Sequence, residues 1–406
     1  MDSMIIVGNP DNKRTRGVQE ARRAAGLPPA LVMPYMELLE GKSIGEQLAR
    51  ADSFEEAGAP LIRIDAPGEH FEVERGLIAL GAPDAEDQDD RLLPLRELVV
   101  PHPLSVQAAS RLREHTGQLY HPSQWFRGYA RLLASIERDA RTRWPEARFV
   151  NEPAAIAGMF DKRHAHTRLT EAGVAVPRRL AEPAELPDYE ALREMMRARR
   201  MPRVFVKLAA GSGACGIIAY QVNPATGAEI AITTIGVENY IAKPPVYYNA
   251  LKPRRCTDSA IIRQMINWLL RHGSHVEQWI AKAAVNGRPF DIRQLVVGGE
   301  ACHSLARISR TPFTNLHLRS ERQSLDEMGL RPVTVQSVRE IAERATAAFT
   351  GASVAGVDVL LSAGSLRPYV LDVNPFGDLL YRVSHEGLGT YEWQIKQLAR
   401  QEEMNA

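Results

Sequence analysis

The sequence has few of the features that mark secreted or membrane-spanning proteins. Of its 406 residues only three are cysteines, and Cys215, Cys256 and Cys302 show no CxxC spacing, which excludes a disulfide framework. No apolar run approaches the ~20 residues that cross a bilayer. The opening residues lack a basic segment followed by a long apolar one, so export is not expected. We therefore expect a reduced, cytoplasmic protein.

The chain also lacks an excess of charge of either sign. Lys and Arg number 50 against 49 Asp and Glu, a net charge of +1. This balance removes the overall attraction on which nucleic-acid binders and anionic-membrane binders depend, so neither partner is expected. The length is sufficient for two or three α/β units, each with its own core. Self-association stays open.

The first 150 residues show the pattern of an open parallel sheet. Met4–Val7 reads as a buried strand, an Arg-rich helical stretch follows it through Ala25, and 31–33 reads as a second strand. Apolar residues recur at helical spacing from Trp125 to Arg143, and Trp144-Pro145 ends that helix. A new unit begins near residue 150.

A glycine loop lies between two strand-like runs in the middle of the chain. The run 203–207 ends at Lys207, the glycines of 211–216 fit GxGxxG, and the β-branched run 217–222 follows. A dinucleotide-binding fold requires a helix after such a loop, so we expect a β-hairpin instead. Backbone N–H groups of this loop can fold over phosphates, with Lys207 beside them. A hairpin tip with an incidental lysine is the other interpretation.

Near the end of the chain, polar side chains lie on two further strand-like runs, 356–361 and 368–375. Asp372 and Asn374 share one strand face because side chains alternate along a strand, and Asp358 on the partner strand can join them. Two carboxylates and an amide oxygen form an all-oxygen set that suits Mg²⁺. The alternative is a pair of buried carboxylates satisfied by arginines.

Two segments between these motifs carry further candidates. The run 275–280 resembles a strand that leads into a loop whose backbone could bond an adenine edge. In 287–297, Asp291 and Arg293 share a strand face, one suited to hydroxyl groups and the other to anions. Arg307 follows on the next strand.

In this order the motifs resemble the ATP-grasp superfamily, most closely the branch of glutathione synthetases and ribosomal-protein glutamate ligases. The resemblance covers about residues 150 to 380 and begins with 151–156, Asp161-Lys162 and 169–177. It implies a fold of two α+β subdomains that clamp ATP, preceded here by a parallel-sheet substrate domain. The expected division is 1–150 for the substrate domain, 151–225 for the first subdomain with the glycine loop, and 226–406 for the second.

The resemblance also implies roles for individual residues. Lys162 and Lys207 match the lysines that contact ATP phosphates, and Asp291 stands where the family holds the ribose. The mobile loop over the phosphates corresponds to Gly211, Ser212, Gly213 and Gly216, and the adenine hinge to Glu277, Gln278, Trp279 and Ile280. Asp358, Asp372 and Asn374 match the metal triplet for Mg²⁺, with Mn²⁺ as the other ion. Arg307, Lys207 and Arg293 are the catalytic candidates.

The sequence departs from the family pattern in three places. Asp372 stands where the family usually has Glu, which shortens its reach by one methylene. The glycine pair expected after Asn315 and His317 is replaced by 319–320, which changes the acceptor side. The stretch 226–272 has no family counterpart that we can place, and a substrate-gripping hairpin and an elaborated surface loop are equally compatible with it.

The chemistry implied is amide formation between a carboxylate and an amine through an acylphosphate, with release of ADP. The substrates expected are amino acids, peptides or related small acids. A kinase that phosphorylates a hydroxyl on the same fold and a nucleotide-binding protein without turnover are the alternatives. Substrate candidates are Arg75, His121 and Arg127 of the first domain and Asn315. Arg75 or Arg127 can bind a carboxylate bidentately, although ordinary surface and core roles are the competing interpretation.

Overall fold

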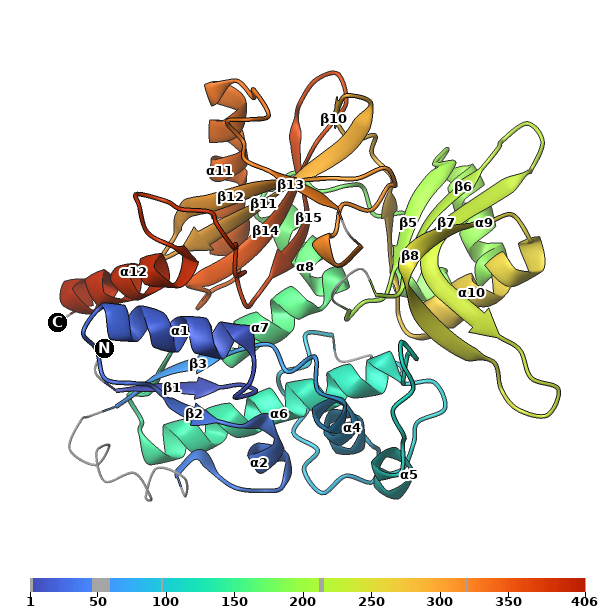
Figure 1. Cartoon of the computed structure of the whole chain (residues 1–406). Helices are drawn as coiled ribbons and strands as arrows, with labels where there is room; N and C mark the ends of the chain where they lie inside the picture. The colour runs from blue at the N-terminus through green and yellow to red at the C-terminus, as the bar shows by residue number, and fades with distance from the viewer. Residues whose placement is uncertain (1–2, 46–58, 96–97, 212–214, 319, 406) are drawn as a thin grey trace.

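Three β-sheets, each covered by helices, make up the structure (Figure 1). It is a computed structural model that describes residues 3–45, 59–95, 98–211, 215–318 and 320–405. The sheets have the strand orders β2-β1-β3-β4, β8-β7-β6-β5-β9 and β13-β12-β11-β14-β15, with β10 paired to β11. We call them the N-terminal, middle and C-terminal sheets. No helix of the described ranges is both long enough and apolar enough to cross a membrane.

The N-terminal sheet is entirely parallel, as the sequence predicts. Its central strands β1 and β3 are buried on both faces, and this explains their unbroken apolar runs. The strands are β1 (Met4–Val7), β2 (Leu31–Met33), β3 (Leu61–Ile64) and β4 (Arg148–Phe149). The helices of this region are α1 (Lys13–Ala24), α2 (Tyr35–Leu39), α4 (Phe71–Leu80), α5 (Val106–Ser110) and α6 (Pro122–Arg143).

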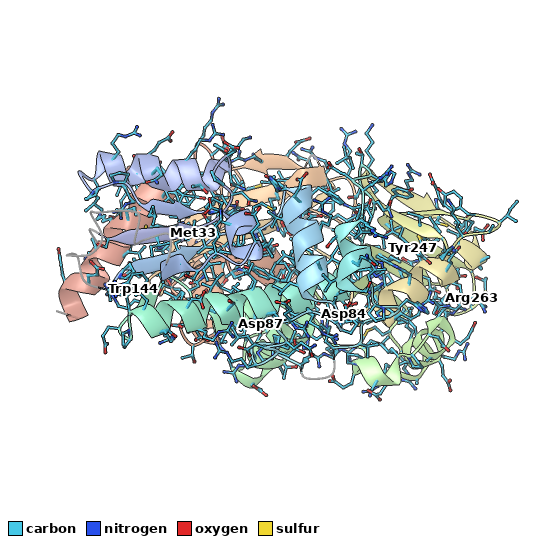
Figure 2. The ribbon with its side chains drawn as sticks, turned by 90° about the horizontal axis from the view of Figure 1, so that it is seen from below. Met33, Asp84, Asp87, Trp144, Tyr247 and Arg263 are labelled. Atoms are coloured by element: carbon cyan, nitrogen blue, oxygen red, sulfur yellow. The ribbon has the colours of Figure 1, made fainter. Side chains whose placement is uncertain are left out.

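Helix α6 is the long helix of this first region. Seen from below, Trp144 marks its end and Asp87 lies beside it, whereas Tyr247 and Arg263 lie at the far end of the molecule (Figure 2). Arg138 of α6 holds Asp87 at 2.8 Å. The acidic segment 84–90 is therefore a surface loop tied to α6, and this agrees with its lack of an apolar face.

The middle sheet is antiparallel throughout. It consists of β5 (Arg203–Lys207), β6 (Ile217–Val222), β7 (Glu229–Glu238), β8 (Val246–Cys256) and β9 (His275–Gln278), covered by α9 (Tyr189–Ala198) and α10 (Ser259–Arg271), with a short 3-10 turn at Pro183–Glu185. The stretch 226–272 is thus a hairpin followed by a helix. The position 225/226, where we expected a domain boundary, falls between β6 and β7 of this one sheet.

The C-terminal sheet carries the strands on which the metal triplet was predicted. It consists of β10 (Ala284–Val285), β11 (Arg288–Val297), β12 (Glu300–Ile308), β13 (Glu321–Gln323), β14 (Val354–Leu361) and β15 (Pro368–Asn374), with α7 (Pro153–Phe160), α8 (Lys162–Glu171), α11 (Pro332–Ala347) and a 3-10 turn at Leu316–Leu318. Its buried core joins side chains of α8 and α11 to those of β11 and β14.

The last helix, α12 (Thr390–Asn405), returns the chain to the N-terminal region, where it lies along α1 (Figure 1). One buried cluster unites Met4 and Val18 with Leu295 of β11 and with Tyr391 and Trp393 of α12. The N-terminal and C-terminal sheets therefore share a core, which fixes the carboxyl ends of β1 and β3 relative to the face of β11, β14 and β15.

Candidate functional site

The glycine loop joins β5 to β6 at the edge of the site. The pairing of β5 with β6 continues past the last strand residues, because Leu208 donates its N–H to the carbonyl of Gly216 at 2.9 Å. Gly216 has a φ of +64°, and a Cβ there would lie 2.2 Å from the Leu208 side chain, so this position requires glycine. Gly211 begins the loop, whereas Ser212 and Gly213 lie outside the described residues. Burial raises the pKa of the Cys215 thiol to about 12, which makes it a poor nucleophile.

Lys207, the last residue of β5, is held by a buried carboxylate. Its Nζ lies 2.6 Å from Glu277 Oε1. Glu277 belongs to the neighbouring strand β9, where it pairs with Phe205 of β5. His275 Nε2 contacts the other oxygen of Glu277 at 3.0 Å. Burial alone would raise the pKa of Glu277, but Lys207 and His275 lower it to about 2. The charged carboxylate of Glu277 therefore fixes the direction of the Lys207 side chain. It also reaches the carbonyl of Leu371 on β15 at 3.4 Å.

Lys162 links the glycine loop to the C-terminal sheet. It is the first residue of α8, whose N-cap Asp161 accepts hydrogen bonds from the N–H groups of Arg163 and His164. The Lys162 ammonium donates to the carbonyl of Gly211 at 3.1 Å and to Asp372 Oδ2 at 3.0 Å. Figure 1 shows α8 between the middle and C-terminal sheets. Lys162 thus stands where the two sheets meet.

The C-terminal sheet presents a row of buried charges on one face. The strand register pairs Asp291 with Arg307, Arg293 with Asp358, and Asp358 with Asp372. Arg307 holds Asp291 bidentately at 2.8 and 2.9 Å, and it also lies 3.0 Å from Asp358. Arg293 Nε lies 2.7 Å from the same oxygen of Asp358. Side chains from three adjacent strands therefore form one continuous network.

Comparisons with known proteins bear on this fold alone. No protein-family model matches the sequence, and no curated protein matches it. Among solved structures, D-cycloserine synthetase DcsG is 14% identical with a TM-score of 0.53, over 98% of this chain and 99% of that one. The ATP-grasp ligase PsnB, complexed with minimal precursor, Mg and ADP, is 16% identical with a TM-score of 0.50, over 98% and 96%.

Biotin carboxylase from Campylobacter jejuni, in a βγ-ATP complex, is a third similar structure. It is 14% identical with a TM-score of 0.51, over 97% of this chain and 70% of that one. The chain has the ATP-grasp fold. The fold predicted from the order of the sequence motifs is thereby confirmed, whereas the branch of glutathione synthetases and glutamate ligases stays a prediction.

In this ATP-grasp fold, the predicted adenine hinge connects the middle and C-terminal sheets. Gln278 ends β9, and its N–H donates to the carbonyl of Arg178, while the N–H of Trp279 donates to the carbonyl of Arg203. The N–H of Ile280 has no main-chain acceptor among the described residues. Trp279 packs on Phe205 with ring centroids 5.4 Å apart. Ile280 therefore has a main-chain N–H that can donate to a ligand such as an adenine edge.

Asp291 is expected at the ribose, but the structure engages its carboxylate fully. Besides Arg307, it contacts Lys282 Nζ at 3.3 Å and the hydroxyl of Thr314, and its exposed fraction is 2%. Burial would raise its pKa, and the two cations lower it to about 2. This geometry favours a role in orienting Arg307 and Lys282 over a direct contact with a nucleotide.

The metal candidates come together as the register predicts. Asp358 and Asp372 are directly opposite on β14 and β15, a spacing at which two carboxylates can share one ion. Asn374 donates its amide N–H to the carbonyl of Gly356 at 2.9 Å. Burial raises the pKa of Asp358 more than Arg293 and Arg307 lower it, so its carboxylate would gain from a further cation.

The residues present therefore fit Mg²⁺ by donor type. Within the described ranges no three His, Cys, Asp or Glu side chains gather as a metal centre, so an ion here would depend on the two carboxylates and the amide oxygen of Asn374. In this structure Lys162 forms an ion pair with Asp372. A metal bound to Asp372 would have to share it with Lys162 or replace that contact.

Three of the four substrate candidates lie in the N-terminal region, on or beside α4 and α6. Arg75 on α4 lies over the ring of Phe71, and Arg127 on α6 donates to the carbonyl of Leu98 at 2.9 Å. His121 caps the start of α6 in a left-handed conformation, and burial lowers its pKa. Asn315 is half-buried next to the 3-10 turn 316–318. Among the described residues, no hydrogen bond or ion pair joins Arg75, His121 or Arg127 to Asp358.

Two residues that sequence reasoning missed connect the N-terminal region to the charged face. Arg14 of α1 donates to the carbonyl of Phe376 at 3.0 Å and lies 3.8 Å from Asp378. Asp378 in turn lies 3.5 Å from Arg293. Lys282 and Thr314, the further partners of Asp291, were missed as well. The available signal was weak: Asp378 follows Asn374 by four residues, and Arg14 is one of several arginines in its helix.

Proposed function

We propose that this protein is an ATP-dependent ligase that joins a carboxylate to an amine. The observation that carries the proposal is the set of cations Lys162, Lys207, Arg293 and Arg307 gathered around two adjacent carboxylates, Asp358 and Asp372, beside a glycine loop. Such a set suits the charge of a transferring phosphoryl group, which fixed cations stabilise. Its support includes the solved structures of the same fold with ADP and Mg and with βγ-ATP.

The reaction proposed has two steps. A carboxylate oxygen of the acid attacks the γ-phosphorus of ATP, and the bond to the bridging oxygen breaks with release of ADP. The amine then attacks the carbonyl carbon of the acylphosphate, phosphate leaves with the electrons of the C–O bond, and the nitrogen loses a proton. The products are an amide, ADP and phosphate. Water must be kept out of the site meanwhile, and closure of the glycine loop can do this.

Each charged residue has a proposed part in these steps. Lys162 and Lys207 hold the phosphates of ATP, and Arg307 with Arg293 neutralises the transferred phosphoryl group. Asp358, Asp372 and Asn374 would hold Mg²⁺, or Mn²⁺, which neutralises phosphate charge when bound. Nucleotide phosphates compete with Asp372 for Lys162. We therefore expect Lys162 to exchange its contact with Asp372 for one with phosphate when the nucleotide binds.

The test is acylphosphate trapping. The protein is incubated with ATP, Mg²⁺ and hydroxylamine against a panel of the common amino acids and short peptides, and both ADP and hydroxamate are measured. We expect hydroxamate in step with ADP for at least one acid, and a loss of at least ~100-fold in Arg307→Met, since it removes a charged contact made to the transferring group.

The matched control is Lys396→Met, which removes an exposed cation of α12 and leaves turnover unchanged. ADP release with a phosphorylated hydroxyl product that hydroxylamine does not trap would show a kinase instead. Binding of ATP, seen as a rise in melting temperature, without turnover across the panel would favour a nucleotide-binding protein that is not an enzyme.

A further inference from the structure

A groove of about 610 Å³ runs beside α1, outside the charged face described above. One wall is the exposed side of α1 from Lys13 to Glu20, and the other is the segment 379–390 that joins β15 to α12. We call it the α1 groove. Its floor passes Gly17, where a Cβ would lie 2.6 Å from the Tyr391 ring. A side chain at position 17 would therefore clash with that ring.

The α1 groove carries an excess of unpaired positive charge. Three cations line it, Lys13, Arg16 and Arg382, against one carboxylate, Glu20. Within the part of the chain that the structure describes, none of the three cations makes an ion pair or a side-chain hydrogen bond. Arg382 is also a non-glycine residue with a φ of +56°. Unpaired like charges around one hollow repel each other, and an anion between them removes that cost.

The α1 groove lies next to the ion pair between Arg14 and Asp378, which is the last contact of the charged face on this side. Lys13 precedes Arg14, and Leu379 follows Asp378, so the Arg14–Asp378 pair stands at the boundary between groove and face. Asp378 continues to Arg293 and from there to Asp358.

The opposite wall is fixed to the same face. Arg322 of β13 donates to the carbonyl of Tyr381 at 2.6 Å, and Arg322 lies directly across from Arg307 in the strand register. Both walls of the α1 groove are therefore tied to the reaction face.

We propose that the α1 groove binds an acidic group of a substrate, a carboxylate or a phosphate, remote from the carboxylate or amine that reacts. That this acidic group belongs to a substrate rests on the ligase activity proposed above. The binding of an anion in the groove does not depend on turnover. The positive charge of the groove comes from Lys13, Arg16 and Arg382. The carboxylate of Glu20 offsets part of that charge. The substrate is then an acid with at least one charged group beyond its reacting atom.

Binding without ATP tests the groove by itself. Succinate and inorganic phosphate are titrated calorimetrically into the full chain at fixed ionic strength. We expect Arg16→Gln and Arg382→Gln each to weaken binding by ~3- to 10-fold and the double variant by ~10- to 100-fold, as expected for charge-assisted contacts at an open site. Glu20→Gln should tighten binding by about 3-fold, because it removes the one carboxylate.

The control is Arg23→Gln, which removes the same charge from an exposed position in the last turn of α1, away from the groove. It should bind both anions as the unaltered protein does. No measurable binding of either anion, equal binding by all variants, or an equal loss in Arg23→Gln would overturn the proposal. Preference between succinate and phosphate identifies the acidic group.

Turnover then separates this proposal from the ligase proposal. ADP release is measured for glutamate against glutamine and for O-phosphoserine against serine. We expect the charged member of one pair to have the lower KM, and Arg16→Gln to raise that KM with little change in kcat. If the anions bind as expected but no acid supports ADP release, the ligase proposal is wrong and the groove proposal stands. If an acid supports ADP release and neither Arg16→Gln nor Arg382→Gln changes it, the ligase proposal stands and the groove proposal is wrong.

Discussion

The middle and C-terminal sheets hold their buried charges in different ways. In the middle sheet Lys207 depends on one carboxylate, Glu277, and His275 is the only further ionisable partner of Glu277 among the described residues. In the C-terminal sheet Asp291 is shared by Arg307, Lys282 and Thr314, and Arg307 reaches Asp358 as well. The first arrangement is a short chain of contacts, whereas the second is a network in which most members have two partners.

This difference suggests different tasks for the two sheets. Under the proposed function, a lysine held by one carboxylate can exchange that contact for a phosphate of the nucleotide. Arginines held in a network are fixed before any ligand binds, as electrostatic stabilisation of a transferring group requires. The two arrangements should therefore respond differently when one member is removed, and the variants below measure that difference.

The largest expected effect is that of Asp291→Asn. This change leaves Lys282 buried without its carboxylate and Arg307 with Asp358 as its remaining one, and a buried charge that loses its partner costs about 3–5 kcal/mol. We expect the free energy of unfolding in urea to fall by that amount. Asp326→Asn, an exposed turn position in the same region, should change it by less than about 0.5 kcal/mol. An equally small loss for Asp291→Asn would show that the network does not depend on this carboxylate.

Glu277→Gln tests the shorter arrangement, and pH gives it a distinct signature. The ordinary pKa of Glu277 is 4.5 and its folded value is about 2, so the unfolded chain binds the extra proton between these values. Its contribution, about 3 kcal/mol at order of magnitude, is therefore present above pH 4.5 and disappears as the pH falls towards 2.

Urea unfolding of Glu277→Gln and of the unaltered protein at pH 7, 4.5 and 3 measures this contribution. The two should differ by about 2–3 kcal/mol at pH 7, and the difference should shrink in acid. The exposed variant Glu194→Gln on α9 serves as control and should show no such convergence. A constant difference across the three pH values would mean that Lys207 does not hold this carboxylate in its charged form.

Much of both arrangements follows from local sequence patterns. The strand after the glycine loop is predicted by its β-branched and aromatic residues, and the shared face of Asp372 and Asn374 by the alternation of side chains along a strand. Lys162 and Arg307 were likewise expected among the charges now found together. The two-residue period of a strand shows which side chains share a face, and it can be recognised within one short segment of sequence.

The partners that sequence reasoning missed depend on packing between distant segments. Arg14 and Phe376 are 362 residues apart, and their contact exists only because α12 and β11 share a core with β1 and α1. Thr314 and Lys282 reach Asp291 through the loops on either side of β11 and β12, whose paths no periodicity predicts. The ribose role expected for Asp291 rested on its motif position, which gives no measure of how many donors would surround its carboxylate.

The smallest expected effect is that of Thr314→Val, and it distinguishes a network from a chain of contacts. The hydroxyl of Thr314 donates to Asp291 and accepts from Lys282. Its removal leaves the bidentate Arg307 contact in place, so the unfolding free energy should fall by only about 1 kcal/mol, the usual worth of one buried hydrogen bond. Exposed Thr350→Val, measured in the same urea titration, should have no effect. A loss as large as that of Asp291→Asn would mean that Asp291 has no redundancy among its donors, and the two sheets would then hold their charges alike.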